Sequence, residues 1–411
     1  MDALVCIILL CEAFLAYVLL DAQGCLKSKA SRLCSVFLIL IAFSLRACVF
    51  DYETLDYLDF LTKWVSFFRN NGHFAALRHS VGNYNIPYLY FLALFSLSGT
   101  KDLYLIKLLS TFFDIILAWA SMKLLSRSTH RVSALIGCFF TVLLLPTVFL
   151  NSAVWGQCDS TYAAMLLLAM YLAFDDRPVL SILALTVAFG FKLQAVFVMP
   201  VFAVFWMRGK FKWFHFLLFP VFYALLVLPA VLLGRPFFDT ITLYFSQTGS
   251  IGNSLNYNSS SLFAILDHVS DPESASVAAI ASAFLFVIAV LLLCYIYRDR
   301  LNDRITLGVA VLFAIGIPFL LPHMHDRYFF CADVLTVVLA FVSWPSFPAA
   351  VLTQFASLLG YHAYLKMRFL LPMRYGAFAL LTSLVLTILF CFFPSDGAET
   401  SGPALNRKRS P

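Results

Sequence analysis

The sequence has few charged residues and no long polar stretch. Only 12% of its 411 residues are charged, whereas 62% are hydrophobic, and the mean hydropathy is +0.89. Soluble domains carry about a quarter charged residues, so this composition excludes a soluble protein. Apolar runs recur from end to end and are too long for barrel strands. We expect an all-α, polytopic membrane protein with one domain over residues 1–395 and a disordered, basic cytoplasmic tail over 396–411.

The sequence also lacks the common signatures of soluble enzymes. It contains no phosphate loop, no GxGxxG after a strand, no HExxH and no GxSxG, which argues against nucleotide, zinc-protease and serine-hydrolase chemistry. The ten cysteines form no CxxC pair and are interpreted as small core residues. The chain begins Met1-Asp2 without a basic segment, which predicts a retained helix and not a signal peptide. We interpret the net charge of +6 as a topology signal and expect no nucleic-acid partner.

Short basic loops between the apolar runs predict which loops are cytoplasmic. The apolar runs cover roughly 3–21, 33–50, 103–125, 132–150, 160–175, 213–233, 274–297, 305–321, 328–345, 347–365 and 375–393. The basic loops lie around Lys27, Arg127, Arg177, Arg208 and Arg298, and in the tail at 407–409. If all of these are inside, then segments 51–102, 151–159, 234–272 and 322–327 lie outside, together with the N-terminus.

Two apolar segments do not fit simple crossings. The run 86–98 is too short to span comfortably, so we expect a juxtamembrane or re-entrant helix. Segment 178–207 has basic loops on both sides, which predicts a tight hairpin that turns at the polar break FKLQ, 191–194. The total is about 13 crossings. Lys366, Arg368 and Arg374 leave the topology of the last two helices open, because they place positive charge beside them.

The unusual polar clusters fall on the predicted outer face. They are the acidic stretch DYETLDYLDFLTKW at 51–64, RHSVGNYNIPY at 78–88, NSAVWGQCDS at 151–160, FKLQ at 191–194, NSLNYNSSS at 253–261 and PHMHDRY at 322–328. Carboxylates beside Arg, Lys and His suit the handling of a phosphorylated lipid, because cations bind phosphate and a carboxylate can deprotonate an incoming hydroxyl. We therefore predict a catalytic outer loop over 51–102, with juxtamembrane helices.

From about residue 46 to 345, these motifs resemble the bacterial relatives of GPI-anchor mannosyltransferases. That group belongs to the GT-C superfamily of multi-spanning glycosyltransferases, which use polyprenyl-phosphate-linked sugars. The resemblance implies an outer-face cavity and a catalytic base in the first outer loop. The family pattern Asp-Tyr-x-x-Phe-x-x-x-Trp matches Asp56, Tyr57, Phe60 and Trp64, which makes Asp56 the leading base. The Asp-Tyr-Glu motif of related glucosyltransferases matches from Asp51 instead, so Asp51 remains the alternative.

The resemblance also assigns further roles as expectations. Asp159 would orient the acceptor or help to hold the site. The donor phosphate would be bound by cations or hydrogen-bond donors among Lys192, Gln194, His325, Arg327, His323 and Gln157. The substrate cavity would be lined by Trp64, Asn83, Tyr84, Asn85, Tyr88, Asn151, Trp155, Asn256, Asn258 and Tyr328. This sequence departs from the family motifs at two positions: Ile86 stands in place of a proline, and Asp326 in place of a glutamate.

We expect an inverting hexosyltransferase, with mannose favoured, in the inner membrane of a bacterium, with its active site on the outer face. Its partners would be the lipid bilayer, a polyprenyl-phosphate sugar donor and a glycan, lipid or protein acceptor. No cofactor is expected; a divalent metal shared by Asp56 and Asp159 is possible but not favoured. Two rival interpretations remain. One is a transporter or flippase of lipid-linked sugars, and the other is an outer-face glycan polymerase. The first should show internal repeats and the second an arginine-rich loop, and the sequence shows neither.

Overall fold

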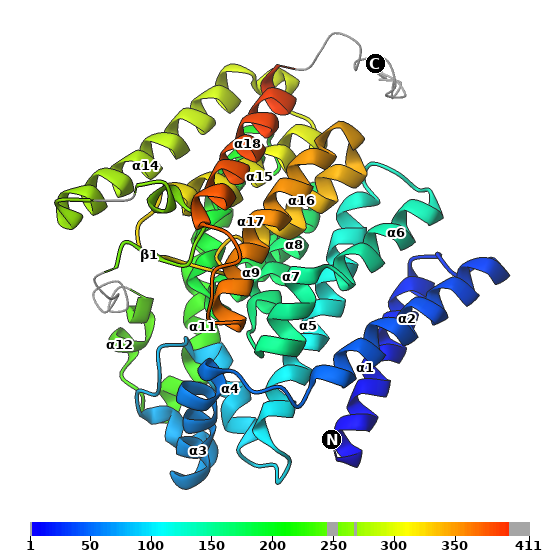
Figure 1. Cartoon of the computed structure of the whole chain (residues 1–411), viewed down its shortest axis with the longest axis vertical. Helices are drawn as coiled ribbons and strands as arrows, with labels where there is room; N and C mark the ends of the chain where they lie inside the picture. The colour runs from blue at the N-terminus through cyan, green and yellow to red at the C-terminus, as the bar shows by residue number, and fades with distance from the viewer. Residues whose placement is uncertain (1, 245–253, 267–268, 394–411) are drawn as a thin grey trace.

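The computed structural model describes residues 2–244, 254–266 and 269–393, and helices make up nearly all of its regular structure (Figure 1). The predicted tail at 396–411 lies outside the described residues. The first half of the chain forms α1 (Ala3–Ala22), α2 (Lys29–Val49), η1 (Tyr57–Leu61), α3 (Thr62–Asn70), η2 (His73–Arg78), α4 (Ile86–Phe95), α5 (Asp102–Leu125), α6 (Val132–Leu143), α7 (Pro146–Phe149), η3 (Leu150–Trp155), α8 (Asp159–Phe174) and α9 (Pro178–Phe191).

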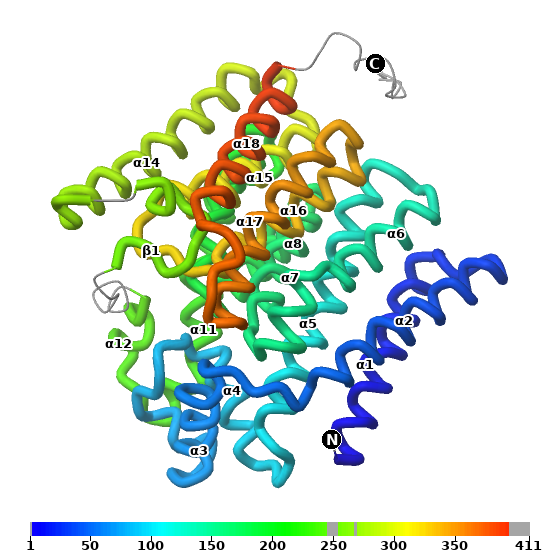
Figure 2. Tube along the Cα trace, viewed as in Figure 1, coloured from blue at the N-terminus to red at the C-terminus, as the bar shows by residue number. Residues whose placement is uncertain are grey.

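The second half is also helical apart from two very short strands. Its elements are η4 (Leu193–Phe197), α10 (Val201–Met207), η5 (Trp213–Leu217), α11 (Leu218–Leu232), α12 (Phe237–Ile241), β1 (Asn256–Tyr257), η6 (Leu262–Ala264), α14 (Pro272–Ile296), η7 (Arg298–Arg300), α15 (Asp303–Leu320), β2 (Met324–His325), α16 (Phe330–Val342), η8 (Trp344–Ser346), α17 (Phe347–Leu365) and α18 (Met373–Phe392). Figure 2 shows the chain running back and forth along the long axis, with α3 and α4 at one end and the end of α18 at the other.

The helices confirm an all-α, polytopic membrane protein. In the described ranges, seven helical segments are long and apolar enough to cross a bilayer: α1, α2, α5, η5 with α11, α14, α15 and α18. An eighth candidate is α6 with the following α7 and η3, which is bent by 42°. Length and composition therefore support up to eight of the roughly 13 expected crossings. The apolar helices α8, α9 and α16 are shorter.

Segment 51–102 starts and ends at the same end of the helix bundle. Lys101 Nζ lies 2.6 Å from Glu53 Oε1, and the Tyr57 hydroxyl donates to Asp102 Oδ1 at 3.1 Å. Helix α4 lies within this segment and has ten residues, with Asn85 as its N-cap. A chain that departs from and returns to one end has not crossed, so the prediction of a juxtamembrane or re-entrant helix at 86–98 agrees with the structure.

Segment 178–207 follows the predicted hairpin path. Helix α9 ends at Phe191, and Lys192 has an extended backbone (φ −149°, ψ 138°) that stops the helix at the polar break. After α10 the chain returns to where it began, because Lys210 Nζ lies 2.8 Å from Asp176 Oδ1, just before α9. The break thus forms the apex of a hairpin and places Lys192 at the far end from the basic loops.

The loops that carry basic residues meet at one end of the bundle, which we call the basic end. Arg127, after α5, lies 3.7 Å from Asp175 and 3.6 Å from Asp303, at the start of α15. Arg208, after α10, lies 2.6 Å from Asp303. Four loops far apart in the sequence therefore share one surface, as the charge pattern predicted.

A small parallel pairing of β1 with β2 holds two loops together at the opposite end. Asn256 pairs with Met324 and Tyr257 with His325. These loops lie directly on α17, where a Cβ at Gly360 would be 2.7 Å from the Asp326 carbonyl oxygen. Only glycine fits so close a contact, which fixes the backbone next to Arg327.

Candidate active site

The loop after α2 carries Asp56, and a buried lysine fixes its start. Lys107 is fully buried on α5, and its Nζ donates to the carbonyls of Phe50 at 3.0 Å and Tyr52 at 2.7 Å. Lys107 Nζ also lies 3.1 Å from the Val49 carbonyl, so it satisfies carbonyls at the end of α2, where helical carbonyls lack partners within the helix, and one in the loop that follows. Lys107 therefore holds the entry to the acidic loop and does not pair with Asp114, which lies two turns further along α5.

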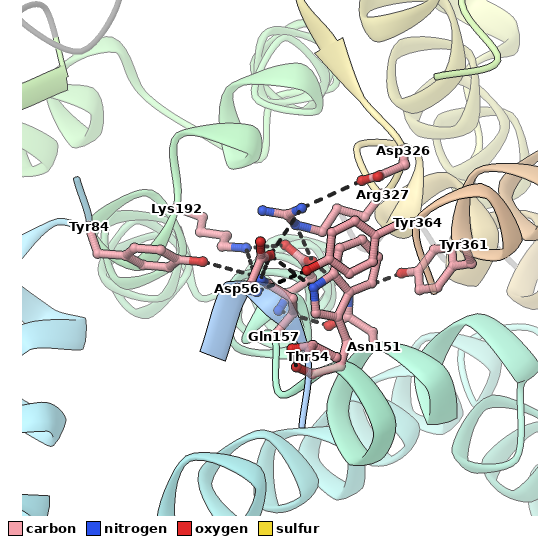
Figure 3. Close-up of polar contacts among 12 residues, drawn as sticks. Thr54, Asp56, Tyr84, Asn151, Gln157, Lys192, Asp326, Arg327, Tyr361 and Tyr364 are labelled. Atoms are coloured by element: carbon pink, nitrogen blue, oxygen red, sulfur yellow. Dashed lines mark hydrogen bonds and ion pairs between the residues drawn. The ribbon is translucent and has the colours of Figure 1, made fainter. Parts of the chain in front are cut away.

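The Asp56 carboxylate lies at the centre of the polar cluster (Figure 3). Its Oδ2 accepts hydrogen bonds from Trp155 Nε1 at 2.9 Å and from Gln157 Nε2 at 2.7 Å. Its backbone N–H donates to the Tyr364 hydroxyl at 3.0 Å. The Asp56 side chain is 22% exposed, so it remains accessible although its position is fixed by three elements.

Asp159 is buried and fully engaged. It lies in the first turn of α8 with a side chain only 2% exposed. Its Oδ1 accepts from Lys192 Nζ at 2.6 Å, and its Oδ2 accepts from Asn151 Nδ2 at 2.6 Å. Asn151 also donates to the Tyr361 hydroxyl at 2.9 Å. Asp159 thus anchors Lys192 at the apex of the hairpin and is already paired as an ion.

Gln157 links Asp56 to the cation Lys192. While its amide N–H donates to Asp56, its Oε1 accepts from the Tyr84 hydroxyl at 2.9 Å and from Lys192 Nζ at 3.4 Å. Lys192 Nζ lies 5.4 Å from the centroid of the Tyr84 ring. The loop at 78–88, the break at 191–194 and the loop at 151–160 therefore converge, as the charge pattern predicted.

Arg327 is a partly buried cation, and its hydrogen-bond donors are incompletely used. Its guanidinium lies 3.9 Å from Asp56, 3.7 Å from Asp159 and 3.5 Å from Asp326, all longer than hydrogen bonds. Within the described part of the chain, its Nε is buried without a hydrogen-bond partner. The guanidinium also lies 5.0 Å from the Trp155 ring. A buried, unsatisfied donor of this kind is costly unless a ligand accepts from it.

The two residues before Arg327 have altered ionisation. Burial, followed by the nearby Arg327 charge, lowers the pKa of His325 to about 4. Burial also raises the pKa of Asp326 to about 7. The lowered pKa favours the neutral imidazole at neutral pH, so a role of His325 at the phosphate would be that of a hydrogen-bond donor. It stacks on Tyr257, with ring centroids 4.7 Å apart.

The other acids of the 51–64 stretch point away from this cluster. Asp51 is exposed and accepts a hydrogen bond from the Tyr104 hydroxyl, which lowers the pKa of Asp51. Glu53 pairs with Lys101, and Asp59 lies 3.6 Å from Lys63. The structure thus separates Asp56 from Asp51, the two candidates for the base that the sequence left open.

Most remaining candidates surround the cluster as packing or loop residues. Trp64, Tyr84 and Tyr88 form an aromatic row with centroid distances of 5.5 and 4.7 Å. Gln194 interacts with the Tyr328 hydroxyl.

Several predicted residues lie in loops, and most of them form contacts that hold these loops in the described structure. Asn85 caps α4 and donates to the Tyr223 hydroxyl, and Asn83 lies in the loop before it. Asn256 bonds the backbone of Ser259, Asn258 has a left-handed backbone at φ 56° and bridges to His325, and His323 Nδ1 lies 2.7 Å from the Ser254 carbonyl oxygen.

The sequence did not point to three residues that complete the site. The Thr54 hydroxyl donates to the Trp155 carbonyl at 3.0 Å. Tyr364 stacks on the Trp155 indole, with centroids 3.9 Å apart and planes 11° apart, and Tyr361 meets the same ring edge-on. Both tyrosines lie on α17, and the sequence around them carries no sign of a site, because tyrosines near a helix end are typical of a membrane interface.

A second buried network of polar side chains supports the backbone next to Asn151 and Asp159. Arg46 pairs with Asp114 at 2.7 Å, and both side chains are fully buried. Asp114 also accepts from the hydroxyls of Ser152 and Ser160, each at 2.5 Å. These serines neighbour Asn151 and Asp159, so the ion pair ties η3 to the start of α8. Arg46 is therefore directed into the helix bundle and not toward the acidic stretch.

The carboxylates do not form a recognisable metal centre in the described ranges. No three His, Cys, Asp or Glu side chains there are grouped as potential metal ligands. The cation that lies near both Asp56 and Asp159 is the Arg327 guanidinium. The residues present therefore do not fit a divalent ion shared by these two carboxylates, and we derive no step through a metal.

Comparison with known proteins identifies the family. No curated protein matches the chain. The sequence model of glycosyltransferase family 87 matches residues 83–321, more than half of the chain, which includes Tyr84, Gln157, Asp159 and Lys192, whereas Asp56 and Arg327 lie outside the match. Family membership excludes the rival reading as a transporter. The chain therefore belongs to glycosyltransferase family 87 of the GT-C superfamily and is an integral membrane glycosyltransferase.

Proposed function

We propose that the protein transfers a hexose, with mannose favoured, from a polyprenyl-phosphate-linked donor to a hydroxyl of a glycan, lipid or protein acceptor. The observation that carries this proposal is the accessible Asp56 carboxylate, held beside two cations, the buried Lys192 and the partly buried Arg327. The reaction needs a base for the acceptor hydroxyl and positive charge for the departing phosphate. The cluster supplies both within one site.

Asp56 is the proposed general base. The hydrogen bonds from Trp155 and Gln157 both reach Oδ2, which leaves Oδ1 for the incoming hydroxyl. A base held in one orientation does not have to reorganise when the proton is transferred. The acceptor oxygen then forms its bond to the anomeric carbon as the bond from that carbon to the phosphate oxygen breaks, and the proton goes to Asp56.

The difference between the two carboxylates supports inversion. A retaining enzyme would need a second carboxylate as nucleophile near the sugar. Asp159 is only 2% exposed and accepts from both Lys192 and Asn151, so it is poorly placed to attack. One accessible carboxylate fits a single direct displacement, in which the configuration at the anomeric carbon inverts.

Arg327 is the proposed main phosphate ligand, assisted by Lys192. The guanidinium keeps donors free, and the buried Nε lacks a partner among the described residues. Guanidinium groups bind phosphate through parallel hydrogen bonds, which become stronger as the leaving phosphate gains charge. No cofactor is required in this proposal.

The location of the cluster supports action on the outer face. The basic loops meet at the opposite end of the bundle, and such loops are typically cytoplasmic. In a bacterial inner membrane, this orientation places Asp56 outside. A glycan polymerase is less well supported, because Arg235 donates to the His79 carbonyl and is buried in the fold.

The test is a transfer assay with purified protein in liposomes. Polyprenyl-phosphate mannose and polyprenyl-phosphate glucose are supplied separately with candidate acceptors, and the products are identified by mass spectrometry. We expect mannose to be transferred with inversion of the anomeric configuration. EDTA should not reduce the rate of transfer. Transfer from neither donor would overturn the proposal, and activity that EDTA removes and Mg²⁺ or Mn²⁺ restores would overturn its metal-free form.

A further inference from the structure

The segment that joins α17 to α18 carries positive charge at the active-site end of the helix bundle, where basic residues are not expected. Residues 366–374 read KMRFLLPMR, and residues 366–372 are all exposed. The segment starts two residues after Tyr364, which accepts a hydrogen bond from the Asp56 backbone, so it lies at the end that holds the active site. Lys366, Arg368 and Arg374 thus depart from the charge distribution that places the other basic loops at the basic end.

Two of these cations differ from Arg127 and Arg208 at the basic end in having no protein counter-ion among the described residues. Arg127 and Arg208 each lie within 4 Å of an aspartate. Lys366 and Arg368 form no ion pair with any acidic residue in the part of the chain that the structure describes, although both side chains are exposed. An external anion would therefore meet them without displacing an existing partner.

Large apolar side chains alternate with these cations. Met367 is 72% exposed, Phe369 is 58% exposed and Leu370 is 64% exposed. Helix α18 starts at Met373 and is long enough to span the bilayer, so the segment lies where a membrane helix begins. Cationic residues mixed with Phe, Leu and Met at that level are typical of a segment that lies in the headgroup region.

A cavity of about 430 Å³ lies along the same segment, lined by Ala264 and residues 369–374. Its walls are mainly apolar, and Arg374 is the charged residue among them. A cavity of this kind offers space for an acyl chain and a cation for the group that the chain carries. A free inorganic anion would gain nothing from the apolar wall or from the exposed apolar side chains.

We propose that residues 366–374 form a binding site for an anionic phospholipid of the surrounding bilayer. Lys366 and Arg368 bind the phosphate of the headgroup, while Phe369, Leu370 and the adjoining cavity accept the acyl chain. The charge is complementary, because Lys366 and Arg368 form no ion pair among the described residues and the lipid is an anion. The site is distinct from the sugar-transfer cluster and does not depend on the proposed donor or acceptor.

The test measures lipid binding and needs no transfer assay. Full-length protein in a neutral detergent is titrated against phosphatidylglycerol with a fluorescent acyl chain, and the dissociation constant is obtained from anisotropy. The double variant Lys366→Gln/Arg368→Gln should bind about 25-fold more weakly, because each cation at an anionic headgroup contributes about fivefold. The matched control, Lys27→Gln/Lys29→Gln, removes two exposed lysines at the start of α2 and should bind like wild type.

Competitors separate the possible anions. Unlabelled phosphatidylglycerol should displace the probe, whereas phosphatidylcholine and glycerol phosphate should displace it weakly. Phe369→Ser/Leu370→Ser should weaken binding without changing its preference for an anionic headgroup. The proposal is overturned if the Lys366/Arg368 variant binds like wild type, if the Lys27/Lys29 control loses as much affinity, or if glycerol phosphate competes as well as the lipid.

Discussion

The two ends of the helix bundle use the same kinds of charged residue in different ways. At the basic end, Arg208 pairs with Asp303 at 2.6 Å, and that aspartate is 31% exposed. At the active-site end, Lys192 pairs with Asp159 at the same distance, but the side chains are only 7% and 2% exposed. Partly exposed pairs contribute about 0–1 kcal/mol each, whereas burying charges costs several kcal/mol unless every partner is in place. We infer that the ion pairs at the basic end hold loops together, whereas the buried charges at the active-site end are positioned to bind a ligand.

The largest difference between the two ends should appear when a buried ion pair is broken. Arg46→Leu leaves Asp114 buried without its cation and should lower the free energy of unfolding by about 3–5 kcal/mol. Arg208→Leu at the basic end should lower it by about 1 kcal/mol or less. Unfolding in mixed micelles, followed by circular dichroism, measures both.

Equal losses in the Arg46 and Arg208 variants would contradict this distinction between the ends. Arg46→Leu/Asp114→Leu is the informative companion, because removing both charges should recover part of the lost stability.

Two glycines with left-handed backbones allow a second comparison. Gly82 has φ 61°, and a Cβ there would lie 2.4 Å from the Trp64 ring, next to the site loop. Gly209 has φ 75° at the basic end, with nothing within 4 Å of a Cβ. Both alanine variants incur backbone strain, but only Gly82→Ala also displaces an aromatic ring. We expect Gly82→Ala to cost about 1–3 kcal/mol more in unfolding free energy than Gly209→Ala. A smaller loss for Gly82→Ala than for Gly209→Ala would show that Trp64 is not fixed where the structure has it.

The smallest predicted effect concerns the hydroxyl that holds the Asp56 backbone. Tyr364→Phe keeps the stack on Trp155 but removes the acceptor of the Asp56 N–H, and should reduce kcat about 2- to 10-fold with KM little changed. Tyr375→Phe, which alters an exposed tyrosine on α18, is the control and should have no effect. A rise in KM at constant kcat would place Tyr364 in substrate binding and not in positioning the base.

The membrane segments were predictable because long apolar runs and basic loops are local signals. The helix break at Lys192 also has such a signal, since a lysine and a glutamine interrupt an otherwise apolar run. The sequence limited the candidates for the base to Asp56 and Asp51 but did not decide between them. Both are acids in one loop, and only the fold shows which of them faces Gln157.

Other features depend on contacts that the sequence does not reveal. Tyr364 reaches the site from α17, more than 300 positions from Asp56 in the sequence. Tyrosines at helix ends are usually interpreted as membrane-interface residues. The ionisation of His325 depends on burial by loops that meet only in the folded chain. Likewise, Lys107 and Asp114 share a helix but bind different partners, because neighbouring helices offer carbonyls to one and Arg46 to the other.

The most direct test of the account compares Asp56→Asn with Asp51→Asn in the liposome transfer assay. Asp56→Asn should lower the rate of transfer by about 10²–10⁴-fold, the usual contribution of a general base, while its thermal stability stays close to wild type. Asp51→Asn should retain most activity, since Asp51 is exposed and bonded to Tyr104, apart from the cluster. Wild-type-like transfer by the folded Asp56→Asn variant, or a comparable loss in Asp51→Asn alone, would contradict the assignment of Asp56 as the base.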